Sequence, residues 1–212
     1  MIIGVNGKIG SGKDTVGKII QYLTTNEAVK KITTLEEWLD SDDLNGRDFN
    51  WKIKKFAGKL KTVASLLTGT PIEKFEDQEF KQKHMGLQWK MTYREFLQKL
   101  GTEAMRDGLH TNVWVNALFA DYKPESTGYN YLYPQWVITD MRFPNEMEAV
   151  EEREGLTIRV VRNNGTRAID INPHASETAL DDAEFDYEII NDGTLEDLVE
   201  KVREILIKEE II

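Results

Sequence analysis

The sequence predicts an α/β protein with a mostly parallel sheet that helices cover on both faces. Short apolar, β-branched runs alternate along the 212 residues with segments in which apolar side chains recur at helical spacing. The first such run, residues 2–5, precedes a glycine-rich loop and then a helix over residues 13–23 with one apolar face. Ligands of such sheets bind beyond the carboxyl ends of the strands, so chemistry is expected at that edge.

The remaining elements follow from the same periodicities. Further strands are expected at residues 51–57, 136–139, 156–162 and 187–190. Further helices are expected at residues 35–39, 60–67, 93–106, 114–122 and 145–153, and after a cap at Thr194 with Asp197 as its capping-box acid. Residues 33–50 are acidic and contain the turn signal Asn45-Gly46, so we expect a surface excursion there.

Composition excludes several classes of protein. The net charge of −10 argues against broad binding to nucleic-acid backbones, although a locally basic pocket can still take a small phosphorylated ligand. The absence of cysteine excludes disulfides, thiolate zinc sites and cysteine nucleophiles. The apolar start, residues 1–5, is too short for a signal peptide or a membrane span. We expect a cytoplasmic protein that binds neither nucleic acid nor membrane.

The glycine-rich loop matches the pattern Gly, four residues, Gly, Lys at Gly7, Gly12 and Lys13. This spacing turns backbone N–H groups inward around a phosphate at the positive end of the following helix, and the lysine bridges the β- and γ-phosphates. The alternative is a glycine-rich turn without a ligand. The preceding strand, the following helix and the lysine favour a nucleotide phosphate site, made of Gly10, Ser11, Gly12, Lys13, Asp14 and Thr15.

The position after the lysine, which is Ser or Thr in the standard pattern, is Asp14. Either Asp14 supplies an oxygen to Mg²⁺, directly or through water, or Thr15 takes part in binding phosphate or metal. Asp140 follows the strand expected at 136–139, and an acid there commonly anchors the Mg²⁺ shell. Its alternative role is an ordinary acid in a turn. The predicted metal ligands are Asp14 and Asp140.

Several arginines near expected turns favour a small-molecule kinase over a switch GTPase, because the chain also lacks the guanine-reading Asn-Lys-x-Asp segment. Transfer of a phosphoryl group between two anionic substrates needs cations to clamp the acceptor and offset charge. Each arginine alone is more often part of a surface salt bridge. As a set, two or three are expected in the site, from Arg94, Arg106, Arg142, Arg162 and Arg167.

An ordered series of short motifs identifies a family. The motifs lie at residues 10–15, 56–61, 94, 97–103, 114, 118–122, 140–146, 160–162, 174–177 and 191–196. In this order they resemble the deoxynucleoside monophosphate kinases of tailed bacteriophages, including the Lys-Asp-Thr departure in the loop. The excursion at 33–50 lies outside the pattern, and residues 69–93 match it loosely.

The resemblance implies a three-layer P-loop NTPase fold of the nucleoside monophosphate kinase kind. Residues 1–212 would form one domain, with an acceptor-binding insertion at about 58–122 and a lid-like segment at about 163–184. The implied reaction moves the γ-phosphate of ATP to a deoxynucleoside 5′-monophosphate with Mg²⁺. The implied partners are small-molecule nucleotides, a homodimer is plausible, and a viral protein would act in the host cytoplasm.

The resemblance also implies roles for individual residues. Lys13, Arg94, Arg142 and Arg162 would form the catalytic set, and Arg167 would reach the phosphates when the lid closes. The acceptor side would comprise Arg94, Arg106, Trp114, Asp140, Arg142 and Glu146.

Several of these residues have an ordinary structural role as the alternative to a role in the site. Trp114 can stack on a base or pack in the core. Asp140 and Glu146 can accept hydrogen bonds from the sugar or base, or lie at a solvated helix start. His174 can be a turn residue. Residues 191–194 can flank adenine or simply cap the last helix.

Two other functions stay open. One is a kinase for another metabolite, such as dephospho-coenzyme A, although residues 94–103 and 140–146 favour a nucleotide acceptor. The other is a non-catalytic nucleotide-binding protein, which Asp14 keeps open because the usual metal-binding hydroxyl is missing there.

Overall fold

The computed structural model describes residues 1–40, 50–126, 128, 130–162 and 175–212, which fall into two compact units. We call residues 1–55 with 123–212 the sheet unit, and residues 56–122 the helical unit. Within the described residues, no helix is long and apolar enough to cross a membrane. Residues 41–49 of the predicted excursion and residues 163–174 of the predicted lid lie outside the described residues.

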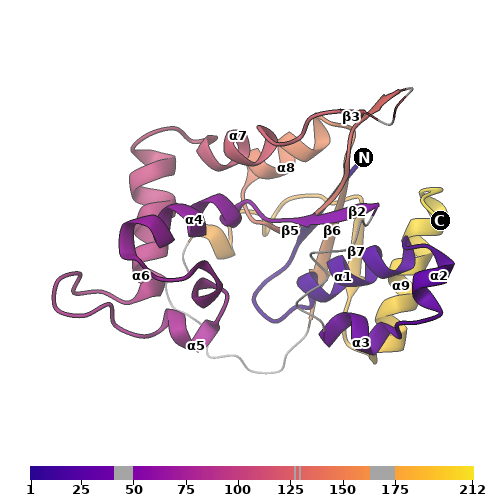
Figure 1. Ribbon diagram of the computed structural model, residues 1–212, viewed down its shortest axis with the longest axis horizontal. Helices are drawn as coiled ribbons and strands as arrows, with labels where there is room; N and C mark the ends of the chain where they lie inside the picture. The colour runs from indigo at the N-terminus through magenta and orange to yellow at the C-terminus, as the bar shows by residue number, and fades with distance from the viewer. Residues whose placement is uncertain (41–49, 127, 129, 163–174) are drawn as a thin grey trace. The chain divides into compact units, whose positions relative to one another are not determined.

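The sheet unit is built on a five-stranded sheet in the order β2-β5-β1-β6-β7, of which Figure 1 labels β2, β5, β6 and β7. Every pair of neighbouring strands is parallel. The strands are β1 (Ile2–Asn6), β2 (Trp51–Lys54), β5 (Gln135–Met141), β6 (Leu156–Val161) and β7 (Tyr187–Ile190). The predicted parallel sheet is confirmed, and all five carboxyl ends meet at one edge.

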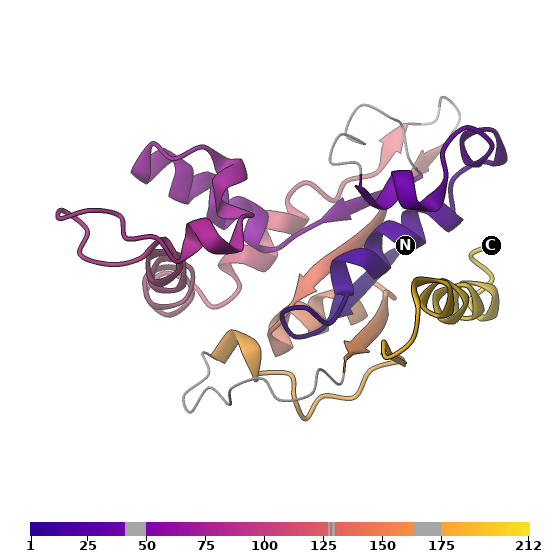
Figure 2. The same cartoon turned by 90° about the horizontal axis from the view of Figure 1, so that it is seen from below.

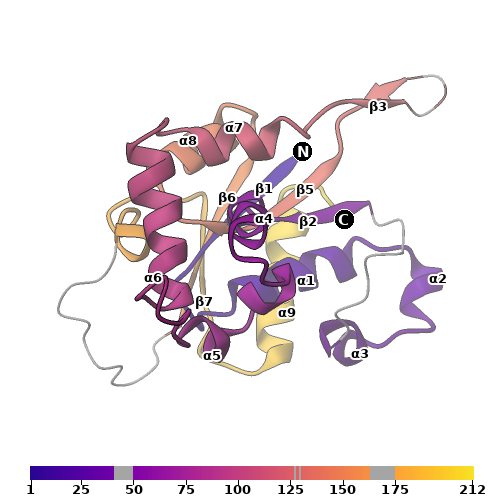
Figure 3. The same ribbon diagram turned by 60° about the vertical axis from the view of Figure 1, so that its left-hand side comes forward.

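Helices cover both faces of this sheet. Ile3 and Val5 of β1 pack into the main core with the apolar faces of α1 (Lys13–Leu23) and α9 (Leu195–Lys208). Figures 2 and 3 show α1 and α9 beside each other. The alternate residue, Gly4, lies against Val150 of α8 (Pro144–Glu151), so α8 covers the opposite face. The period of two along β1 therefore separates the two layers of helices.

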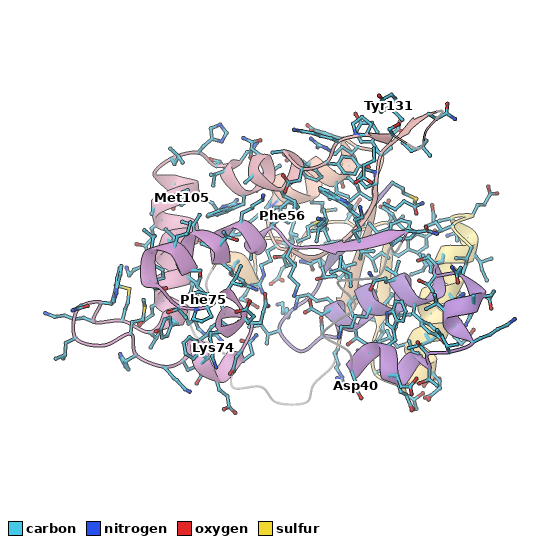
Figure 4. The ribbon with its side chains drawn as sticks, viewed as in Figure 1. Asp40, Phe56, Lys74, Phe75, Met105 and Tyr131 are labelled. Carbon is cyan, nitrogen blue, oxygen red and sulfur yellow. The ribbon has the colours of Figure 1, made fainter. Side chains whose placement is uncertain are left out.

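Smaller elements complete the sheet unit. Helices α2 (Glu27–Lys30) and α3 (Leu35–Asp40) follow α1, and the fully buried Trp38 of α3 packs edge-on against Tyr22 with ring centroids 5.5 Å apart. Strands β3 (Glu125–Ser126) and β4 (Tyr131–Leu132) pair antiparallel ahead of β5. Tyr131, labelled in Figure 4, is exposed on this hairpin.

The helical unit contains α4 (Ala57–Thr68), a 3₁₀ turn η1 (Ile72–Phe75), α5 (Gln78–Lys81), α6 (Tyr93–Gln98), a π-helix η2 (Lys99–Asp107) and α7 (Val113–Phe119). Ala64, Phe75 and Phe96 form one buried cluster in it. Figure 4 labels Phe75, which meets Tyr93 edge-on at 6.0 Å. This unit falls on the predicted acceptor-binding insertion, and its role stays a prediction.

The structure corrects two predicted strand ends. The strand predicted at 51–57 ends at Lys54, because Phe56 has helical backbone angles and packs against Phe119 instead of joining the sheet. The strand predicted at 136–139 runs to Met141, because Asn6 of β1 pairs with Met141 and donates its side-chain amide to the Met141 carbonyl at 2.8 Å. Asp140 therefore lies within β5 rather than after it.

The helix predicted at 93–106 changes character within its length. It begins as an α-helix behind a capping box at Thr92 and becomes a π-helix at Lys99. In the π-helical part, Gly101 packs so closely on Leu60 that an added Cβ would lie 2.9 Å from a Leu60 methyl group. The capping box predicted for the last helix, Thr194 with Asp197, is confirmed.

Candidate phosphate-binding site

The glycine-rich loop closes tightly over the start of α1. Gly10 and Gly12 have φ of 77° and 99°, in the left-handed region that favours glycine. Ser11 N–H donates to the Lys8 carbonyl at 3.0 Å, which turns the chain back on itself. A Cβ on Gly7 would lie 2.3 Å from Ser11 Oγ and 2.8 Å from the Val160 carbonyl oxygen. The loop thus allows no side chain at its first glycine and presents its backbone to a ligand.

The geometry of the loop fits an anion. The first N–H groups of α1 have no partners within the helix, and they carry the positive end of its dipole. Ser11 Oγ is buried and has no hydrogen-bond partner among the described residues. A buried hydroxyl without a partner is costly in a folded protein. A phosphate oxygen seated on the loop would satisfy both sets of donors, which supports the predicted role of Gly10–Gly12.

Lys13 begins α1 and is 8% exposed. Burial lowers the pKa of its ammonium group, and the Asp14 carboxylate, whose Oδ2 is 3.7 Å from Lys13 Nζ, acts in the opposite direction. Arg142 lowers the pKa further, because two cations repel. An anion such as a polyphosphate would further stabilise the charged form of this buried lysine. Lys13 is therefore suited to the phosphate contact that the motif predicts.

Asp14 is surrounded by donors from three elements. Its Oδ1 accepts a hydrogen bond from Thr139 Oγ1 of β5 at 2.9 Å and lies 3.1 Å from Lys55 Nζ, just after β2. Burial by itself would raise the pKa of Asp14, but Lys55, Lys13 and the Thr139 hydroxyl outweigh it, and the pKa is lowered. The carboxylate is thus held ionised beside the loop. Sequence reasoning missed Lys55 and Thr139.

Arg142, the first residue after β5, is hydrogen-bonded through its backbone to the side chain of Glu146. Glu146 Oε2 accepts from the backbone N–H groups of Arg142 at 2.7 Å and Phe143 at 3.1 Å, so this buried carboxylate caps the start of α8. That arrangement is the helix-start alternative for Glu146, here in a buried form. The Arg142 guanidinium donates to Glu177 Oε1 at 2.6 Å.

A cavity of about 440 Å³ lies beside the loop. It is bounded by the outer side of the loop, the end of β6 and residues 176–181, and three arginines line it: Arg142, Arg159 and Arg162. Two ion pairs cross it, Arg142 with Glu177 and Lys8 with Asp181 at 3.1 Å. The predicted residue Arg162 is therefore in a cationic cavity next to the phosphate loop, whereas Arg167 and His174 lie outside the described residues.

Three predicted acceptor residues lie in the helical unit. Arg94 donates to Gln78 Oε1 at 3.0 Å on the surface, and Arg106 is buried in the π-helix. Trp114 is buried, and its indole N–H donates to the Gly101 carbonyl at 2.9 Å. This hydrogen bond and the burial match the core-packing alternative for Trp114. Their acceptor roles stay predictions.

The donors present fit a magnesium ion. Within the described residues, no group of three or more His, Cys, Asp or Glu side chains is arranged to hold a metal. Mg²⁺ needs no such cage, since it usually binds through one or two carboxylates, waters and substrate phosphates. The carboxylates of Asp14, Glu177 and Asp140 each raise the pKa of Lys13, so both predicted metal ligands are near enough to the loop lysine to act on its charge.

A glycine loop over a helix start, a buried lysine and a parallel sheet behind them define a P-loop nucleotide-binding protein. The family model for deoxynucleotide monophosphate kinases matches residues 52–202, well over half of the chain. The chain therefore belongs to the deoxynucleotide monophosphate kinase family, as its motifs predict. The loop and α1 precede the matched region, so the structural description of the loop is independent of that match.

Individual relatives agree with the family. The chain is 36% identical to a deoxynucleotide monophosphate kinase of Escherichia phage RB69 over 113 residues, which cover 53% of this chain and 44% of the relative. It is 32% identical to that of Enterobacteria phage T4 over 120 residues, covering 56% and 46%. The alignment with the deoxynucleoside-5′-monophosphate kinase of Escherichia phage T5 is 23% identical and covers 90% and 89%. The chain thus spans less than half the length of the first two relatives.

Proposed function

We propose that this protein transfers the γ-phosphate of ATP to a deoxynucleoside 5′-monophosphate, giving a deoxynucleoside diphosphate and ADP. The observation that supports this most is the closed loop with the buried Lys13 at the start of α1, in a chain of this kinase family. The names of the phage relatives specify the acceptor class.

The donor side follows from the loop. The N–H groups at the start of α1 and the Ser11 hydroxyl bind the β-phosphate, and Lys13 spans the β- and γ-phosphates. Asp14 and Asp140 would hold magnesium, which would supply charge neutralisation for the phosphates when bound. Arg142 and Arg162, both lining the cationic cavity, offset charge on the transferring group. No general base is needed, because the acceptor phosphate is already anionic.

The acceptor side is proposed for the helical unit. The family match includes this whole unit, and Arg94 and Arg106 provide cations for an acceptor phosphate. Trp114 contributes indirectly, by holding α7 against η2, because its indole N–H already donates to the Gly101 carbonyl. Glu146 serves the acceptor side indirectly, by fixing the backbone of Arg142.

The test is a panel of all deoxynucleoside and nucleoside monophosphates with ATP and Mg²⁺, followed by chromatography of the products. We expect ADP and a deoxynucleoside diphosphate to form together. Lys13→Ala should lower turnover at least about 100-fold, because it removes the buried cation from the transferring phosphate. The control Lys208→Ala changes an exposed lysine of α9 and should leave turnover unchanged. Turnover of dephospho-coenzyme A alone, or ATP binding without transfer, would favour the other two functions.

A further inference from the structure

Asn191 contacts the phosphate loop from a position 180 residues away in the chain. It follows the last residue of β7, and its backbone N–H donates to the Val161 carbonyl at 2.7 Å, which continues the pairing with β6. Its side-chain Nδ2 donates to the Ser11 carbonyl oxygen at 2.8 Å. The side chain is buried, so this hydrogen bond has little competition from water.

The same amide lies directly against Gly12. A Cβ on Gly12 would be 2.4 Å from Asn191 Nδ2, closer than two such atoms can approach. Gly12 also has φ of 99°. Two separate constraints, the backbone angle and the closeness of Asn191, therefore require glycine immediately before Lys13.

The Ser11–Gly12 peptide links Asn191 to the ligand side of the loop. A trans peptide is planar, and its C=O and N–H point in opposite directions. Because Asn191 holds the Ser11 carbonyl, the N–H of Gly12 must point away from Asn191. Gly12 is the residue that caps the start of α1, where an anion would bind.

We propose that Asn191 is a positioning residue for the phosphate loop, which locks the Ser11–Gly12 peptide so that the Gly12 N–H is aimed at a nucleotide phosphate. The inference rests on the proposed use of the loop to bind ATP. Asn191 touches neither reactant, and it acts through one backbone peptide. Preorganisation of this kind matters because a flipped peptide would present a carbonyl oxygen to the phosphate.

The helix cap considered for residues 191–194 is made by Thr194 and not by Asn191. Thr194 accepts the N–H of Asp197 on its hydroxyl and caps α9. The side-chain amide of Asn191 donates to Ser11 instead of to that helix. A buried amide must be hydrogen-bonded to offset its desolvation, and the loop is where this one is used.

Asn191→Asp tests the proposal with almost no change in shape. The carboxylate cannot donate to the Ser11 carbonyl, so the orientation of the Ser11–Gly12 peptide is no longer fixed by this side chain. In calorimetric titrations with ADP and Mg²⁺ at about pH 8, we expect the Kd to rise roughly tenfold or more, as for loss of a hydrogen bond to a charged group. The KM for the monophosphate acceptor should stay within about twofold, because the loop binds the other nucleotide. Asn26→Asp, the same exchange at the exposed N-cap of α2, where the side chain only accepts a hydrogen bond, should leave both values unchanged.

The pH dependence separates positioning from general damage. Once protonated, the carboxyl group introduced by Asn191→Asp can again donate to the Ser11 carbonyl, so the affinity of the variant for ADP should recover as the pH falls toward about 5. Wild type measured at the same pH values provides the reference. Equal ADP affinity in wild type and variant at the alkaline pH would overturn the proposal, as would a rise in the acceptor KM as large as the rise in the Kd for ADP. Failure of wild type to bind ADP would instead overturn the proposed function.

A measurement on wild type covers the case in which the variant does not fold. In ¹⁵N-resolved NMR spectra, ADP should shift the Gly12 amide proton downfield, and the Asn191 side-chain amide should exchange slowly with solvent. If the chemical shift of the Gly12 amide proton does not change at saturating ADP, the proposal is wrong.

Discussion

The ion pair between Lys55 and Asp14 gives a prediction whose size follows from the structure. Lys55 Nζ is 3.1 Å from Asp14 Oδ1, and the two side chains are 33% and 56% exposed. At this distance the Coulomb attraction is about 1.3 kcal/mol in water and about 5 kcal/mol at an effective dielectric constant of about 20. Exposed pairs measure only about 0.2–1 kcal/mol, because water screens them and side chains lose entropy. For this half-buried pair we expect about 1 kcal/mol.

A double-mutant cycle measures that energy. Lys55→Met keeps the unbranched stem, and Asp14→Asn keeps the shape, so the cycle isolates the charge pair. The free energies of unfolding come from urea denaturation at about pH 7. The matched control is Lys52→Met with Glu125→Gln, a pair in the same unit at 3.2 Å but 42% and 63% exposed. Its coupling should be smaller. A Lys55–Asp14 coupling under about 0.3 kcal/mol, or one no larger than the control, would refute the reasoning.

The same cycle has a defined pH dependence. The pKa of Asp14 is lowered in the folded protein, despite burial that acts to raise it, because Lys55, Lys13 and Thr139 favour its charged form. A lowered carboxyl pKa contributes stability that is present above the unfolded value of about 3.9 and is lost as the pH falls through the folded value. The coupling should therefore be complete near neutral pH and shrink in acid. In Lys55→Met, an NMR titration should show the pKa of Asp14 raised, because burial then has less opposition.

Three further changes test other parts of the structure. Gly12→Ala places a Cβ 2.4 Å from the Asn191 amide at φ of 99°, so ADP binding by calorimetry should be lost, and near-normal affinity would contradict the loop geometry. Glu177→Gln frees Arg142 from a 2.6 Å ion pair, so ATP should bind about two- to tenfold more tightly; weaker binding would show that the pair supports the site. Trp114→Phe removes the 2.9 Å bond to the Gly101 carbonyl, so urea denaturation should show a loss of about 1–3 kcal/mol. A stability equal to wild type would mean that the indole N–H does not matter to packing.

Sequence periodicity predicted the parts of the fold in which a local pattern decides the structure. The helix Lys13–Leu23 and the strand Tyr187–Ile190 have the predicted bounds, because apolar spacing and flanking turn residues agree there. The strand expected at 51–57 was too long, since Phe56 is apolar like a strand residue but packs among helices. Periodicity does not say which layer an apolar residue joins.

The site was predictable as far as the motif extends. Lys13 and Asp14 follow from spacing alone, but Lys55, Thr139 and Asn191 do not. Lys55 and Asn191 directly follow β2 and β7, Thr139 lies near the carboxyl end of β5, and only the strand order brings them to the loop. A polar residue at the carboxyl end of a predicted parallel strand was the signal available for them. Asn191 was noticed for a different reason, as part of a turn before the last helix.

The exchange of the usual hydroxyl for Asp14 now has a physical account. An extra carboxylate beside a phosphate site is unfavourable by itself, because like charges repel at short range. The chain offsets it with Lys55 at 3.1 Å, and the hydroxyl of Thr139 donates a hydrogen bond to the same carboxylate oxygen at 2.9 Å. The standard loop places one hydroxyl directly after its lysine. Here a carboxylate stands at that position, and its charge is stabilised by Lys55 after β2 and by Thr139 of β5, so Asp14 depends on both of these residues.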